Sequence, residues 1–109
     1  MRAETRKIMT AFLAGKPARA DRTHTDGASV YLHRKRIAWR EPNGDVCMTL
    51  AGWGTVTTRE RLNGLCELLM CKRPFHQKKH VQYFDDTEIH TLQVISVHNI
   101  IPVTMDFAA

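Results

Sequence analysis

A series of cysteines and histidines near the middle of the chain has the residue types that bind zinc. The series consists of Cys66, Cys71, His76 and His80. Thiolates and imidazoles are the usual ligands of structural zinc, but the two cysteines would lie on one helix about 140° apart, a poor geometry for one ion. Cys66 also falls on the apolar stripe of that helix. We therefore expect a core cysteine there, and predict neither a metal nor a cofactor.

Histidines and acidic residues cluster further along the chain, and such groups act as general bases or bind divalent metals in nucleases. The cluster comprises His76, His80, Asp85, Asp86, Glu88, His90 and His98. No catalytic motif orders them, because the sequence has no HExxH, no GxSxG and no glycine-rich phosphate loop. A metal-dependent nuclease is therefore the least favoured function, and we predict a protein without enzymatic activity.

Positive charge gathers in two basic loops and one turn, which form the predicted partner-binding surface. Its residues are Lys16, Arg19, Arg22, Arg34, Lys35, Arg36, Lys72, Arg73, Lys78 and Lys79. If the fold brings them to one side, the cations would meet phosphates while Tyr31, Phe75 or Tyr83 stack on bases. Aromatic residues at such positions are more often part of a core, so both interpretations stay open.

The positive charge is concentrated in the first part of the chain. Residues 1–40 contain ten basic and three acidic side chains, an excess of seven, whereas residues 41–109 contain six basic and eight acidic ones. A basic segment attracts phosphate or an acidic protein surface over long range and in a salt-dependent way. A solvated surface without a partner would carry the same charges.

The elements that would position these charges begin with a helix over residues 4–14. Its apolar stripe consists of Ile8, Met9, Phe12 and Leu13. Gly15 and Pro17 are typical of a helix end. Residues 15–28 have no hydrophobic periodicity and are rich in turn-forming residues, which predicts a mobile basic loop.

Residues 29–50 predict a three-stranded antiparallel meander. Ile37 and Trp39 alternate with Ala38 and Arg40, as in a half-buried strand. The segment EPNGD that follows predicts a tight turn, because proline presets φ while asparagine and glycine tolerate positive φ. Trp39 itself fits either a core or an interface, and so does Trp53.

The run TVTTRERLNGLCELLM predicts a second helix that opens with a capping box, since Glu60 follows Thr57 by three residues. Its core stripe would be Leu62, Leu65, Cys66, Leu69 and Met70. Its outward residues would be Arg59, Glu60, Arg61, Asn63 and Glu67. Gly64 costs about 1 kcal/mol relative to alanine, so the helix must depend on packing. Because acidic side chains accompany the arginines, a packed helix is favoured over a nucleic-acid recognition helix.

Two further strands are predicted over residues 81–84 and 88–98. Pro102 would end the last strand or place it at a sheet edge. The order of elements predicts a single α+β domain over residues 1–109. We expect a mainly antiparallel sheet of about four or five strands packed against two helices.

The cysteines also indicate the compartment. Cys47, Cys66 and Cys71 are an odd number without framework spacing, which is typical of a reduced intracellular protein. No run approaches the roughly 18 apolar residues that span a bilayer. We therefore expect a cytoplasmic protein without a membrane partner.

Two stretches resemble small accessory proteins of tailed bacteriophages. They are YLHRKRIAWREPNGDVCMTLAGWGTVTTRERLNGL, residues 31–65, and QKKHVQYFDD, residues 77–86. In those proteins a YLHxxxIA strand, a turn and LAGWxTxTTRxRLN follow one another. The resemblance implies a viral protein made in a bacterial host, which acts by binding a host enzyme, a defence complex or nucleic acid.

We therefore expect a non-enzymatic phage accessory protein in the host cytoplasm. Its leading function would be to bind and modulate a host macromolecule, such as a defence or transcription component, through the basic loops. The alternative is a nucleic-acid-binding module that contacts phosphate directly.

Overall fold

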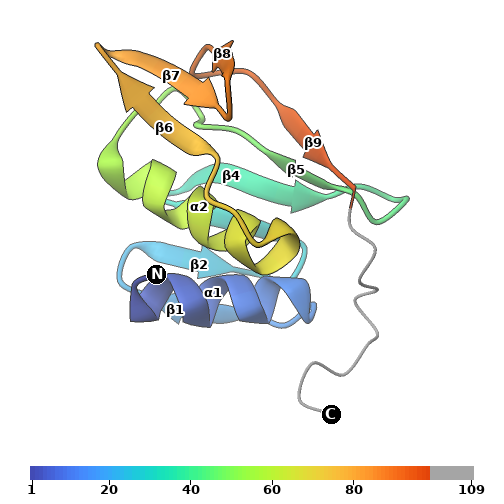
Figure 1. Ribbon diagram of the computed structural model, residues 1–109. Helices are drawn as coiled ribbons and strands as arrows, with labels where there is room; N and C mark the ends of the chain where they lie inside the picture. Colours follow the sequence, from blue (N-terminus) through green and yellow to red (C-terminus); the bar gives the residue numbers. More distant parts are fainter. Residues whose placement is uncertain (99–109) are drawn as a thin grey trace.

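The computed structural model describes residues 1–98, which form two helices and nine strands in two sheets (Figure 1). The helices are α1 (Ala3–Leu13) and α2 (Val56–Met70). The larger sheet contains β1 (Ala18–Ala20), β2 (Thr23–Thr25), β3 (Ser29–Leu32), β4 (Lys35–Arg40), β5 (Val46–Met48) and β9 (Ile95–Val97), in that spatial order. The smaller sheet contains β6 (Phe75–Lys78), β7 (Val81–Phe84) and β8 (Thr87–Ile89). The pairing is antiparallel throughout, which confirms the predicted α+β class within the described residues.

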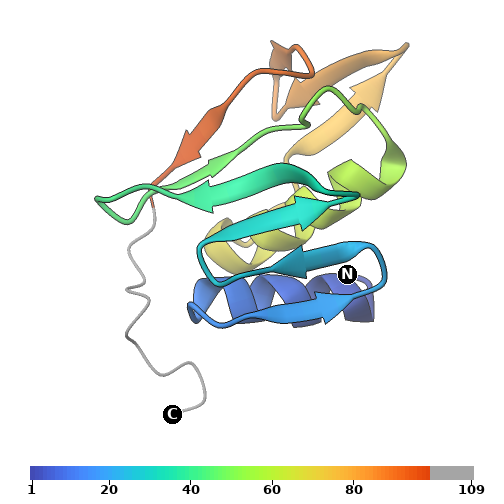
Figure 2. The same ribbon diagram turned by 180° about the vertical axis from the view of Figure 1, so that it is seen from behind.

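Both helices cover one face of the larger sheet, and the main core lies between them. Helix α1 packs on β1, β2 and β3, while α2 packs on α1, β4 and β6. The core contains Ile8, Phe12, Ile37, Met48, Leu62 and Leu65 among its fully buried side chains. Figure 2 looks onto the other face of this sheet, and no described helix or strand lies over it. We call this uncovered side the outer face.

The region 15–28 is not the structureless loop that its sequence predicts. It forms β1 and β2, which pair with one another and with β3. The side chains that face α1 are short: Ala18 and Ala20 are partly buried, while Thr23 and Thr25 are buried. Because these residues lack large apolar side chains, no hydrophobic pattern in the sequence predicts the hairpin. The number of strands was therefore underestimated.

Several predicted elements are confirmed. Helix α1 ends in a Schellman motif, in which the Gly15 N–H donates to the Phe12 carbonyl and the Lys16 N–H to the Ala11 carbonyl. The predicted meander corresponds to β3, β4 and β5, and the strand predicted at 81–84 is β7. The strand predicted over 88–98 is wrong, because β8 and β9 are short and belong to different sheets. Pro102 lies outside the described residues.

Arg61 is buried, against the prediction that it points to solvent. Its side chain is 1% exposed and joins α2 to α1 and to the larger sheet. The Nε group donates to the Thr23 hydroxyl at 2.9 Å, and Nη1 donates to Thr5 at 2.6 Å and to Glu60 at 2.6 Å. Removing a charged arginine from water is costly, so it is buried only when carboxylate and hydroxyl oxygens accept hydrogen bonds from its N–H groups. We call Arg61, Glu60, Thr5 and Thr23 the inner network.

Two other residues of α2 differ from their predicted roles. The N-cap is Thr55, whose hydroxyl accepts from the Thr58 N–H at 3.2 Å, so Thr57 and Glu60 do not form a capping box. Asn63 is buried rather than outward, and its amide forms two 2.8 Å hydrogen bonds with the backbone of Phe75. Asn63 thereby fixes the start of β6 against the helix.

Candidate nucleic-acid interface

A β-bulge between β3 and β4 places an arginine and a tryptophan together on the outer face. Tyr31 pairs with Arg36, whereas the residue before it pairs with Ala38, so Ile37 is the extra residue. Ile37 and Ala38 are consequently both buried. Arg36 and Trp39, three positions apart, then share the outer face. The predicted alternation along this strand is wrong at the bulge, and Trp39 is not a core residue.

Cross-strand partners on β1 to β4 form a row on the outer face. Together with Trp39, the row consists of Arg19, His24, Tyr31 and Arg36. The His24 and Tyr31 rings stack with centroids 4.9 Å apart and planes 12° from parallel. The Arg36 guanidinium lies 4.1 Å from the Trp39 ring centroid, within the range of a cation–π contact. We call these five residues the outer row.

A carboxylate at the end of β4 fixes the orientation of the tryptophan in the outer row. The Trp39 indole N–H donates to Glu41 at 3.0 Å, and the Cys47 thiol donates to the same oxygen at 3.2 Å. These hydrogen bonds, led by that from Trp39, hold the pKa of Glu41 below its ordinary value. The ring is therefore held in place, and the part of it that is not buried is accessible to a partner.

An open groove lies beside the outer row, between two hairpin turns. The β1–β2 turn and the β3–β4 turn enclose about 570 Å³. The lining residues are Arg19, Asp21, Arg22, His24, His33 and Arg34. Asp21, His33 and Arg34 have positive φ angles of 55°, 50° and 70°, which two-residue hairpin turns require. The groove thus adds two arginines to the cations of the outer row.

The fold brings most of the predicted basic residues to one end of the molecule. The β1–β2, β3–β4 and β6–β7 turns lie at the same end as the start of α2 (Figures 1 and 2). Of the predicted surface, Arg22, Arg34 and Lys35 lie at or beside the first two turns, and Arg19 and Arg36 belong to the outer row. Lys35 points to the helix side of β4, where its Nζ lies 5.3 Å from the Trp53 ring centroid.

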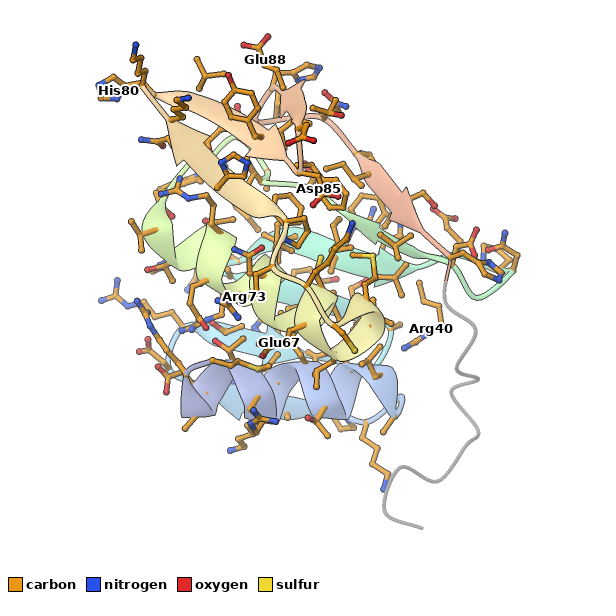
Figure 3. The ribbon with its side chains drawn as sticks, viewed as in Figure 1. Arg40, Glu67, Arg73, His80, Asp85 and Glu88 are labelled. Atoms are coloured by element: carbon orange, nitrogen blue, oxygen red, sulfur yellow. The ribbon has the colours of Figure 1, made fainter. Side chains whose placement is uncertain are left out.

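Lys78 and Lys79 lie at the same end but belong to the smaller sheet. They border the β6–β7 turn, whose tip is marked by His80 in Figure 3. On the same hairpin the His76 and Tyr83 rings stack with centroids 5.2 Å apart. Of the three aromatic residues proposed to stack on bases, Phe75 is buried in the core, whereas Tyr31 and Tyr83 are half-buried.

Three predicted residues lie at the opposite end. Lys16 follows the end of α1 (Figure 1). The Lys72 ammonium is 2.5 Å from the Asp85 carboxylate, and Arg73 is 3.8 Å from Glu67 (Figure 3). These two cations are therefore partly neutralised, and the predicted residues do not form one continuous surface.

A family model of the Kyanoviridae Gp96 protein matches residues 1–100. The chain belongs to this family. Kyanoviridae Gp96 is a phage protein family, which confirms the expectation of a phage protein. No curated protein and no solved structure matches the chain.

The cysteines and histidines of this Gp96-family protein do not converge. Cys66 is fully buried, and burial raises the pKa of its thiol to about 12, whereas Cys71 is the exposed C-cap of α2. Within residues 1–98 no group of three or more His, Cys, Asp or Glu side chains is arranged to hold a metal ion. The absence of cofactor and of enzymatic activity stays a prediction. No helix in the same range is long and apolar enough to cross a membrane.

Proposed function

We propose that this Gp96-family protein is a non-catalytic phage accessory protein that binds single-stranded nucleic acid on its outer row, in the cytoplasm of the infected host. The observation that carries the proposal is the row itself, in which Tyr31 lies between Arg19 and Arg36 and Trp39 lies beside Arg36 on an uncovered sheet face. Aromatic faces stack on unpaired bases of any sequence, while arginines neutralise the phosphates that link them.

The dimensions of the outer row suit a short stretch of single strand. Neighbouring strands lie about 4.8 Å apart, so the four strands span about 14 Å. An open four-stranded sheet with exposed aromatic side chains stacks two or three bases. The adjoining groove supplies Arg22 and Arg34 for the phosphates that continue past the row.

The same geometry disfavours double-stranded DNA. Bases in a duplex are stacked on one another, so Tyr31 and Trp39 would have no free base to contact. A duplex is usually read by a helix inserted in the major groove, but α2 is packed against α1, β4 and β6. The buried position of Arg61 removes one of the two arginines that such a helix would have presented.

The test is binding of fluorescent oligothymidylate, measured by anisotropy over a series of salt concentrations. We expect affinity to fall linearly on logarithmic axes, with a slope of about −0.7 per neutralised phosphate. Arg19→Gln with Arg36→Gln should weaken binding and reduce the slope. The matched control, Lys16→Gln with Lys72→Gln, removes equal charge from the opposite end. It should bind oligothymidylate more tightly than the double arginine variant. Equal losses in the two double variants, or no binding, would refute the proposal.

Modulation of a host protein is a second candidate, because apolar side chains are exposed near the start of α2. Trp53, Val56 and Leu92 are 46%, 65% and 70% exposed, and exposed apolar patches mark protein interaction sites. Tagged protein would be purified from host cells with and without nuclease. A partner that is retained after nuclease but lost in Val56→Asp and Leu92→Asp supports this candidate, whereas loss of every partner on nuclease treatment contradicts it.

A further inference from the structure

A second hollow lies on the helix side of the β3–β4 turn. Its volume is about 170 Å³. Leu32, Ile37 and Leu50 supply apolar lining, Trp53 adds an aromatic ring, and Lys35 and Thr57 add a cation and a hydroxyl. An apolar cavity of about 150 Å³ accommodates benzene, so this pocket has room for one ring-sized group. It is smaller than the pockets of about 300–1,000 Å³ that hold larger ligands.

The pocket suits a planar ring that has a negatively charged group close to it. Trp53 is 46% exposed, so part of its indole surface is free for stacking. The His33 ring is only 17° from parallel to the indole, with centroids 6.4 Å apart. Lys35 holds its ammonium 5.3 Å from the indole centroid, where it would meet a phosphate that is linked to the ring through a sugar. No carboxylate lines the pocket to oppose such a group.

One hydroxyl group in the pocket is available to a ligand. Thr55 and Thr58 hydroxyls are 2.9 Å apart and hydrogen-bond to one another. The Thr57 hydroxyl, in contrast, makes no hydrogen bond with the residues that the structure describes, and its side chain is half-buried. A hydroxyl can donate to or accept from the edge of a base.

We propose that this pocket receives one unstacked base of the strand that lies on the outer row. His33 lines both the pocket and the open groove beside the outer row, so the two hollows meet at the β3–β4 turn. A strand that crosses this turn passes Arg34 and then Lys35 with its phosphates and places a base against Trp53. The inference rests on the proposed function, because it assumes that the outer row binds the strand.

The chain has only two tryptophans, and each reports one of the two places. Trp39→Phe leaves Trp53 as the reporter of the pocket, and Trp53→Phe leaves Trp39 as the reporter of the outer row. Each full-length variant, checked for folding by circular dichroism, would be titrated with oligothymidylate and with an abasic strand of equal length. The abasic strand keeps the phosphates but has no bases.

We expect oligothymidylate to quench Trp53 emission in Trp39→Phe, and the abasic strand to leave it unchanged. Trp53→Ala should lower the affinity for oligothymidylate about 5- to 150-fold, the range for loss of one stacked base, but not the affinity for the abasic strand. Quenching of Trp39 alone would overturn the pocket inference and leave the proposed function intact. Equal quenching of Trp53 by both strands would also overturn it, and quenching of neither tryptophan, with no change in anisotropy, would overturn both proposals.

Discussion

Two arginines on opposite sides of the larger sheet show how differently one residue type is used. Arg61, in the inner network, is 1% exposed and hydrogen-bonds to α1, α2 and β2. Arg36, in the outer row, is exposed and lies over an aromatic ring. Each arginine has a charged neighbour in the sequence, so the pattern of charge along the chain does not distinguish them. The difference is whether the protein itself satisfies the donors, which separates a structural arginine from one that is free to bind a partner.

The largest expected effect comes from removing the structural arginine. Arg61→Met should lower the free energy of unfolding by about 3–5 kcal/mol, because it leaves the Glu60 carboxylate without its cation. Urea denaturation followed by circular dichroism measures the change. Arg36→Met is the matched control and should stay within about 1 kcal/mol of the original protein. Similar losses in both variants would contradict the distinction between the two sides.

A smaller but clear loss of stability is expected from a change at the contact between α1 and α2. A Cβ atom at Gly64 would lie 2.3 Å from the Thr5 Cγ2 atom, so Gly64→Ala forces α1 and α2 apart. We expect a loss of about 1–3 kcal/mol in unfolding free energy, despite the better helix propensity of alanine. Thr5→Ser removes the clashing methyl group and keeps the hydroxyl, so the double variant should recover part of the loss. A Gly64→Ala protein as stable as the original would refute the close contact.

Low pH should destabilise the fold by protonating Glu60 in the inner network. Burial opposes ionisation of this carboxyl, but hydrogen bonds from Thr5, the Arg2 backbone and Arg61 outweigh it and lower the pKa. A lowered folded-state pKa stabilises the fold above the unfolded value of about 4.5, and this stability is lost as the pH falls through the folded pKa. The melting temperature of Glu60→Gln should therefore depend less on pH between about pH 5 and pH 3 than that of the original protein. An identical pH profile would show that Glu60 titrates as it does when unfolded.

The smallest effect on stability is expected on the outer row. Arg36→Gln removes an exposed cation–π contact, so the unfolding free energy should change by no more than about 0.5–1 kcal/mol. Its affinity for oligothymidylate should fall, and its salt slope should lose about 0.7 for one phosphate contact. Thermal denaturation and anisotropy on one preparation test both statements. A stability loss without a change in affinity would reverse the roles given to the two sides.

The sequence predicted the elements whose signals are local. The Gly15 helix end, the EPNGD turn and the stripe of Leu62, Leu65 and Cys66 depend on neighbouring residues, and each is found in the structure. Gly44 of that turn has a φ of 93°. Hydrophobic periodicity and turn-forming residues are enough to predict such elements, because their formation does not depend on distant contacts.

The errors that affect the core and the candidate surface involve tertiary contacts or strand pairing. Arg61 was predicted to be outward, and besides the adjacent Glu60 its donors are satisfied by the hydroxyls of Thr5 and Thr23, 56 and 38 positions away. Trp39 reaches the outer face through a bulge that is defined by the pairing of β4 with β3. Of the candidate surface, the residue types were predictable, but their grouping depends on the β1–β2 hairpin, which short side chains concealed.

The hairpin turns also have a consequence for how this surface can change. His33, Arg34, Lys79 and His80 occupy positive φ angles between 50° and 70°, a region where glycine is free of strain and a bulky side chain costs about 1–3 kcal/mol. Glycine at these tips would be more stable but would carry no charge. The tips are therefore the positions at which selection for thermal stability and selection for a basic surface oppose one another, and glycine substitutions there should stabilise the fold while making the surface less basic.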